Sequence, residues 1–111
     1  MEITMQYKNL SDAEKVSFDD YISEKTGKVE KLLTKFSEDG VLLKISIEKF
    51  DKHDAYAVEW HLALPSKKLI ASEASHTITK AVDLSKDRLL EQLKKHLAQL
   101  RKESDNSSIR G

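Results

Sequence analysis

The sequence predicts an α+β domain in which four strands and two long helices follow the order β-α-β-β-β-α. Two observations carry this prediction: segments whose apolar residues alternate, and two long segments whose apolar residues recur at helical spacing. Because an antiparallel sheet with one apolar face must bury that face, both helices are expected to pack on one side of a four-stranded sheet. The 111 residues suffice for a single modest core.

Four segments are predicted to be strands. In residues 2–7 apolar residues alternate with polar ones, and the same alternation marks residues 41–48 and 56–64. The second and third segments, joined by a polar turn at 51–54, are expected to form a hairpin, and residues 69–74 form the fourth strand. Tyr56 and Trp60 fall on the core side of the third strand. The sheet is therefore not expected to offer an aromatic platform for single-stranded RNA.

Two segments are predicted to be helices. Ser11 and Glu14 have the spacing of a capping box, and apolar residues at helical spacing extend the first helix to about Ser37. Thr77 is the expected N-cap of the second helix, which should run to about Lys102. Residues 1–102 are thus the predicted single domain. Residues 103–108 lack core-forming side chains, and residues 103–111 are expected to form a disordered polar tail.

Composition excludes several functional classes. The chain has no cysteine and three glycines, which excludes disulfides, thiolate catalysis and a glycine-rich phosphate loop. No two of the four histidines have the i, i+4 spacing of a helical metal clamp, so no metal site is expected. No apolar run approaches the roughly 20 residues of a membrane span, and no secretion signal is visible. We expect a cytoplasmic protein without catalysis, cofactor, membrane or small-molecule substrate.

The charged residues are unevenly distributed although 19 basic and 19 acidic side chains cancel. Arg88, Lys95 and Lys102 recur every seven residues beside the apolar stripe of the second helix, a repeat of about 10 Å that suits a phosphate backbone. The first helix carries lysines beside its own stripe. A solvated helix face is the ordinary alternative for each set. With both helices on one side of the sheet, the two sets could form one continuous basic surface.

Three segments resemble a known family. They are EKTGKVEKL at residues 24–32, YAVEWHLALP at 56–65, and the last helix, with AVD at 81–83 followed by DRLLEQLKKH at 87–96. Together with the element order, they resemble the ribosome hibernation-promoting factors, also called ribosome-associated inhibitors or sigma-54 modulation proteins. The resemblance covers about residues 1–100. Glu91 stands where the family usually has arginine, and the chain corresponds to the short form, without the further C-terminal domain of long members.

The resemblance implies that the protein binds the small ribosomal subunit, and we expect it to be a monomer. It would contact ribosomal RNA in the groove that holds messenger and transfer RNA, and inhibit translation under stress or in stationary phase. The implied RNA-binding residues are Lys25, Lys28, Lys31, Arg88 and Lys95, and Lys102 extends the second stripe.

Two other functions remain open from the sequence alone. One is a protein-interaction or regulatory module of the same fold with weakened RNA affinity, which the zero net charge and Glu91 favour. The other is a double-stranded RNA reader, which is disfavoured because that module begins with a helix, whereas a strand comes first here.

Overall fold

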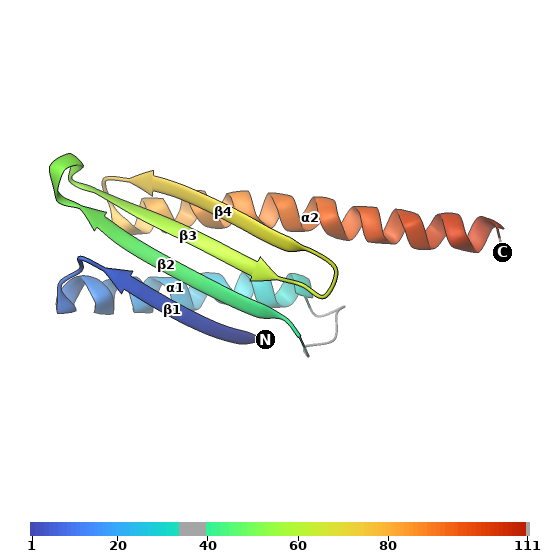
Figure 1. The fold of residues 1–111 in the computed structure, drawn as a ribbon, viewed down its shortest axis with the longest axis horizontal. Helices are drawn as coiled ribbons and strands as arrows, with labels where there is room; N and C mark the ends of the chain where they lie inside the picture. Colours follow the sequence, from blue (N-terminus) through green and yellow to red (C-terminus); the bar gives the residue numbers. More distant parts are fainter. Residues whose placement is uncertain (34–39, 111) are drawn as a thin grey trace.

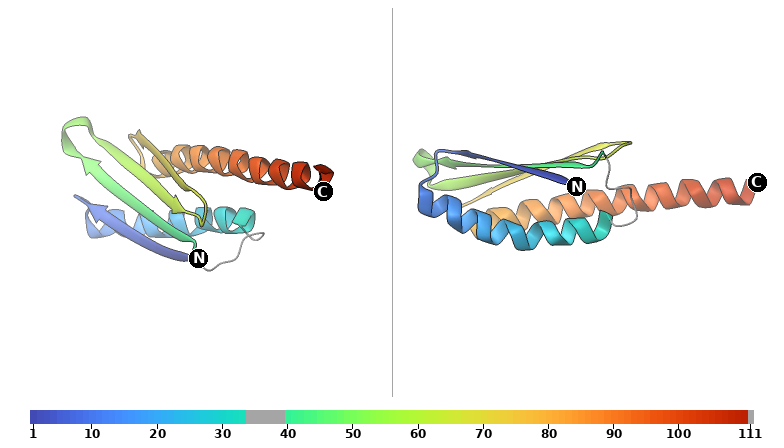
Figure 2. Two further views of the ribbon diagram at one scale, coloured as in Figure 1. Left: turned by 45° about the vertical axis from the view of Figure 1, so that its right-hand side comes forward. Right: turned by 90° about the horizontal axis from the view of Figure 1, so that it is seen from below.

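The computed structural model describes residues 1–33 and 40–110, with side chains up to residue 100. The elements are β1 (Glu2–Lys8), α1 (Asp12–Leu32), β2 (Leu42–Phe50), a short 3₁₀ turn (Asp51–His53), β3 (Ala55–Ala63), β4 (Lys68–Ser75) and α2 (Ile78–Arg110). The predicted β-α-β-β-β-α order is therefore confirmed (Figure 1). Both helices cover the same face of the four-stranded sheet, which also agrees with the prediction (Figure 2).

The sheet is mixed, and the expectation of an antiparallel sheet is wrong for its first strand. The strand order is β1-β2-β3-β4. β3 runs antiparallel to both of its neighbours, but β1 runs parallel to β2, with Glu2 opposite Leu42. The cause is α1, which carries the chain back along the sheet, so that β2 begins at the same end as β1.

The helix starts agree with their predicted caps. Ser11 Oγ accepts the backbone N–H of Glu14 at 3.2 Å, and Glu14 Oε1 accepts the N–H of Ser11 at 2.9 Å, which completes the capping box. Thr77 Oγ1 accepts the N–H of Lys80 at 3.2 Å. The predicted end of the first helix near Ser37 lies outside the described residues. α2 continues to Arg110, past its predicted end near residue 102; the domain boundary there and the disordered tail stay predictions.

The core lies between the sheet and the two helices, and Trp60 is fully buried in it. Its Nε1–H donates to Ser85 Oγ at 2.8 Å, and Ser85 Oγ donates in turn toward the carbonyl oxygen of Ala81 at 2.7 Å. The one polar atom of the indole is thereby satisfied. Tyr56 lies half-buried on the same inner face. The inward orientation predicted for both aromatic rings is confirmed.

A polar cluster ties the start of α1 to β2 and β3. The Tyr56 hydroxyl donates to the Glu14 carboxylate, and Lys49 Nζ lies 3.4 Å from the same carboxylate. The hydrogen bond from Tyr56, followed by that from the Ser11 backbone, lowers the pKa of Glu14 to about 2. The same bond to Glu14 raises the pKa of Tyr56 to about 12. The cluster thus favours the ionised carboxylate in the folded state.

This pKa shift predicts acid-dependent stability. Because the folded-state pKa of Glu14 lies below its ordinary value of 4.5, the carboxylate stabilises the fold above about pH 4.5, and this contribution is lost as the pH falls toward 2. We expect Glu14→Gln to lower the free energy of unfolding by about 2 kcal/mol at pH 7. Urea unfolding at several pH values checks this: the gap between wild type and variant should close with acid. A gap that stays constant down to pH 2 would contradict the assignment.

Candidate functional site

The two helices lie side by side (Figure 2), and a polar cluster joins them. The Tyr21 hydroxyl on α1 donates to the Asp83 carboxylate on α2, at 2.8 and 2.7 Å from its two oxygens. This hydrogen bond raises the pKa of Tyr21. Lys25 Nζ lies 3.6 Å from Asp83 Oδ1 and 4.8 Å from the centroid of the Tyr21 ring. Asp83 therefore marks the flank of α2 that faces α1. We use the term interhelical groove for the line along which this flank meets α1, together with the recess that lies on it between Tyr21 and Thr79.

Two lysines of the groove are mostly covered. The side chain of Lys25, a predicted RNA contact, is 15% exposed and engaged with Asp83. The side chain of Lys86 is 10% exposed and lies 3.2 Å from Asp87. Both ammonium groups are largely engaged in ion pairs within the protein. Lys25 is therefore better placed to position the helices than to contact a phosphate. Lys86 follows Val82 by one helical turn, so the sequence spacing alone predicts that Lys86 lies on the buried stripe of α2.

Two other lysines flank the groove and are exposed. Lys28, predicted from the sequence, follows Lys25 by three residues and so continues the α2-facing side of α1. Lys94 follows Asp83 by three helical turns and so lies on the α1-facing flank of α2. Among the described residues neither has an ion-pair partner. Lys31, also predicted, is exposed further round α1. Sequence reasoning missed Lys94 because the tertiary packing, which local periodicity does not reveal, decides which flank faces α1.

The groove is polarised along its length. Between the middle of α1 and the start of α2, an open recess of about 280 Å³ is lined by two carboxylates and three uncharged residues, namely Asp20, Glu24, Ser17, Tyr21 and Thr79. The exposed lysines Lys28 and Lys94 lie further along each helix. A polyanion would thus be repelled at one end of the groove and attracted at the other.

The stripe predicted on α2 lies on the opposite flank. Arg88 Nε forms an ion pair with Glu73 on β4, and Gln92 Nε2 donates to the carbonyl oxygen of Ile70 on the same strand at 2.9 Å. Lys95, with 76% of its side chain exposed, lies 3.7 Å from Glu91. These contacts place the stripe beside β4 and away from α1.

The single basic surface considered from the sequence is therefore split into two. Because they are seven residues apart, Arg88 and Lys95 lie on one line of α2, as predicted. That line borders β4, and the solvent-exposed side of the helix separates it from the groove. The side chain of Lys102, which would extend this line, lies outside the described part of the structure.

Among the residues whose side chains are described, 1–33 and 40–100, no cluster of three or more His, Asp or Glu could hold a metal ion. No helix in this range is long and apolar enough to cross a membrane.

A family model described as "Sigma 54 modulation protein / S30EA ribosomal protein" matches residues 3–101. The chain belongs to this family. Sigma-54 modulation proteins are non-enzymatic modulators that bind ribosomes. The family resemblance noted in the sequence is thus confirmed, and with it the expectation that the protein is not an enzyme.

Solved structures of similar proteins support the fold. The N-terminal domain of Protein Y from Thermus thermophilus is 24% identical, with a TM-score of 0.67, over 86% of this chain and 99% of that one. A ribosomal subunit interface protein from Coxiella burnetii is 26% identical, with a TM-score of 0.59, over 88% of this chain and 99% of that one. A comparison with curated proteins finds no match.

Proposed function

We propose that this sigma-54 modulation protein binds the small ribosomal subunit through its helical layer and inhibits translation under stress or in stationary phase. It docks against ribosomal RNA in the groove that holds messenger and transfer RNA, in the cytoplasm and without a cofactor. The RNA-binding surface is formed by Lys28, Lys31, Arg88, Lys95 and Lys102, to which we add Lys94. Lys25 acts within this surface by holding the two helices in place.

The observation that carries the proposal is the pair of exposed lysines on the two sides of the interhelical groove. Neither Lys28 nor Lys94 forms an ion pair with another described residue, so both ammonium groups are available to a polyanion. The family assignment supports a ribosomal partner: the Coxiella burnetii relative is described as a ribosomal subunit interface protein. A phosphate backbone along the groove would displace counterions and gain salt-dependent affinity without reading base sequence.

The helical layer restricts what can bind there. Asp20 and Glu24 at the start of the groove oppose a phosphate, which fixes the direction and the extent of the contact. Net charge is zero, so long-range attraction to any nucleic acid is weak. Affinity then depends on a partner whose shape brings its phosphates to the lysines, as a folded ribosomal RNA groove does.

Co-sedimentation with purified small and large subunits at about 50 mM and 200 mM salt tests the proposal. We expect binding to the small subunit that falls by about 10³-fold or more between these salts if six or more phosphates are contacted. Messenger RNA and initiator transfer RNA added first should compete with the protein for the site.

Two results would contradict the proposal. Affinity that does not change with salt would favour a protein partner, which is the interaction-module alternative. Salt-dependent binding that messenger and transfer RNA leave unchanged would support an RNA surface but place it elsewhere on the subunit.

A further inference from the structure

The two edges of the sheet are protected unequally. At the β4 edge, Gln92 of α2 bonds to the outward carbonyl oxygen of Ile70, and Arg88 pairs with Glu73 of the same strand. β1 is the outermost strand on the other side (Figure 1). Within the described part of the chain, no side chain bonds to the backbone of β1. An unprotected edge strand presents unpaired N–H and C=O groups that can accept another strand.

The backbone of β1 shows which of its residues offer those groups. Glu2 donates its N–H inward, to the carbonyl oxygen of Val41 at 3.1 Å. Since backbone groups alternate in direction along a strand, those of the even-numbered residues point to β2. The N–H and C=O groups of Ile3, Met5 and Tyr7 therefore point to the open edge, evenly spaced about Met5.

The sequence of β1, EITMQYK, is complementary to itself in the antiparallel direction. When two copies align with Met5 opposite Met5, Glu2 lies opposite Lys8, Thr4 opposite Gln6, and Ile3 opposite Tyr7. The three outward-pointing residues then form hydrogen-bonded pairs, and the charged and polar residues form the closer non-hydrogen-bonded pairs. A single register therefore pairs opposite charges, pairs polar residues with each other, and places the outward-pointing backbone groups opposite one another.

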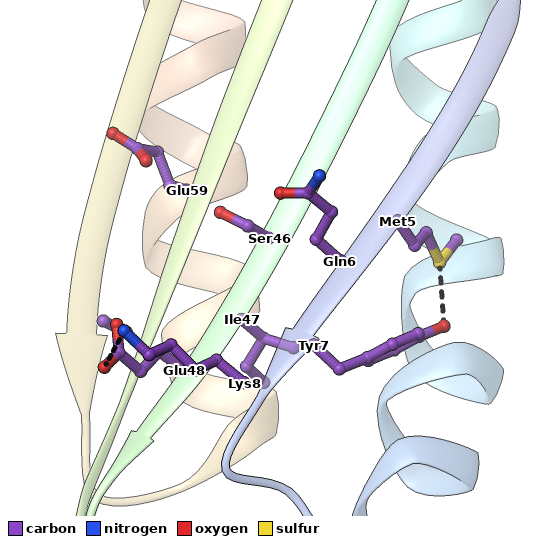
Figure 3. Close-up of a pocket in the computed structure, with 9 residues that line it drawn as sticks. Met5, Gln6, Tyr7, Lys8, Ser46, Ile47, Glu48 and Glu59 are labelled. Carbon is purple, nitrogen blue, oxygen red and sulfur yellow. Dashed lines mark hydrogen bonds and ion pairs between the residues drawn. The ribbon is translucent and has the colours of Figure 1, made fainter.

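We propose that two copies of this chain associate along β1 in that register, joining their sheets into one continuous eight-stranded sheet. Opposite charges at Glu2 and Lys8 meet twice across the twofold axis on the outer face of the sheet. Figure 3 shows Gln6 and Lys8 on this face, with Lys8 beside Glu48, and Tyr7 turned the other way toward Met5. Lys8 keeps 76% of its side chain exposed, so it remains accessible to a second partner.

The association is weak because one seven-residue strand buries less surface than a stable interface requires. The monomer predicted from the sequence is the dilute form, and the dimer forms at high protein concentration. The proposal does not depend on RNA binding, since β1 lies at the sheet edge away from α2.

Charge reversal in mixtures tests the pairing. In Glu2→Lys chains, like charges meet at both ends of the interface, and the same holds for Lys8→Glu chains; an equimolar mixture restores both opposite-charge contacts. Sedimentation velocity across a range of concentrations should show a wild-type dimer, a loss of dimer of at least fivefold in each variant alone, and recovery in the mixture. Circular dichroism verifies that each variant is folded. A wild-type protein that stays monomeric at millimolar concentration, or a mixture no more dimeric than its components, would overturn the proposal.

Cross-linking tests the register. Because the chain has no cysteine, an introduced thiol is the only one in its chain and can cross-link at that position alone. Positions 4 and 6 face each other at a Cα separation of about 4.5 Å in a non-hydrogen-bonded pair, within the range of a disulfide. Two copies of position 4 are diagonal neighbours about 7–8 Å apart. A mixture of Thr4→Cys and Gln6→Cys chains should therefore oxidise to a heterodimer several times faster than either chain cross-links to itself. Equal rates in all three samples would overturn the register.

Discussion

Replacing Lys28 and Lys94 together by Glu is expected to lower affinity for the small subunit by about 100-fold and to reduce the salt slope by about two. Each lysine supplies an exposed ammonium on one side of the interhelical groove, and reversal replaces an attraction to phosphate by a repulsion. Neither lysine holds an ion pair with a described residue, so the fold should keep its stability. Equilibrium binding of labelled protein to small subunits at several salt concentrations measures both quantities.

A matched control separates position from total charge. The variant Lys52→Glu/Lys67→Glu changes net charge by the same amount, at exposed lysines in the turns of the sheet. It should bind within about threefold of wild type if local phosphate contacts dominate. Equal losses in the two double variants would mean that net charge alone governs binding, and the groove assignment would fail.

The second flank of α2 is tested in the same assay. Arg88→Glu/Lys95→Glu reverses the stripe beside β4, where both side chains already lie next to carboxylates. Because the proposed RNA-binding surface includes Arg88 and Lys95, this variant should lose affinity as well. A loss confined to the groove variant would restrict the RNA contact to the α1 side.

Trp60→Ala is expected to lower the free energy of unfolding by about 3–5 kcal/mol, a large share of the 5–15 kcal/mol typical of a domain. The indole is fully buried between the sheet and α2, so truncation leaves a cavity at the centre of the core. Urea unfolding followed by circular dichroism measures the loss.

The hydrogen bond of Trp60 can be tested apart from its packing. Ser85→Ala removes the acceptor of the indole N–H and leaves that donor buried without a partner, at a cost of about 1–3 kcal/mol. Ser72→Ala, at an exposed position on β4, should change stability by less than about 0.5 kcal/mol. Equal effects of the two serine variants would show that the Trp60–Ser85 bond contributes nothing.

Much of the fold could be predicted because the signals are local. Period-two alternation located three of the four strands, and the cap residues Ser11 and Thr77 marked both helix starts. The direction of β1 was missed, since alternation of side chains is the same in parallel and antiparallel strands. Only the presence of a helix between β1 and β2 carries that information, because such a connection can return the chain to the end of the sheet where β1 begins.

The candidate site was predicted less well than the fold. Spacing identified which lysines share a line on one helix, but the line of Arg88 and Lys95 could be placed only through its contacts with β4. The same is true of Lys25, whose charge is covered by Asp83, a residue far away in sequence. Facing flanks and ion pairs between elements are tertiary properties, and the pattern within one helix does not determine them.

The parallel pairing of β1 with β2 has a consequence for how the protein folds. β2, β3, β4 and α2 pack with their neighbours in sequence, whereas each β1 residue must find a partner beyond an entire helix. Closing that longer loop costs more chain entropy before any contact is gained. During synthesis β1 emerges first yet cannot join the sheet until β2 has left the exit tunnel. The pairing of β1 with β2 is therefore expected to be a late event in folding.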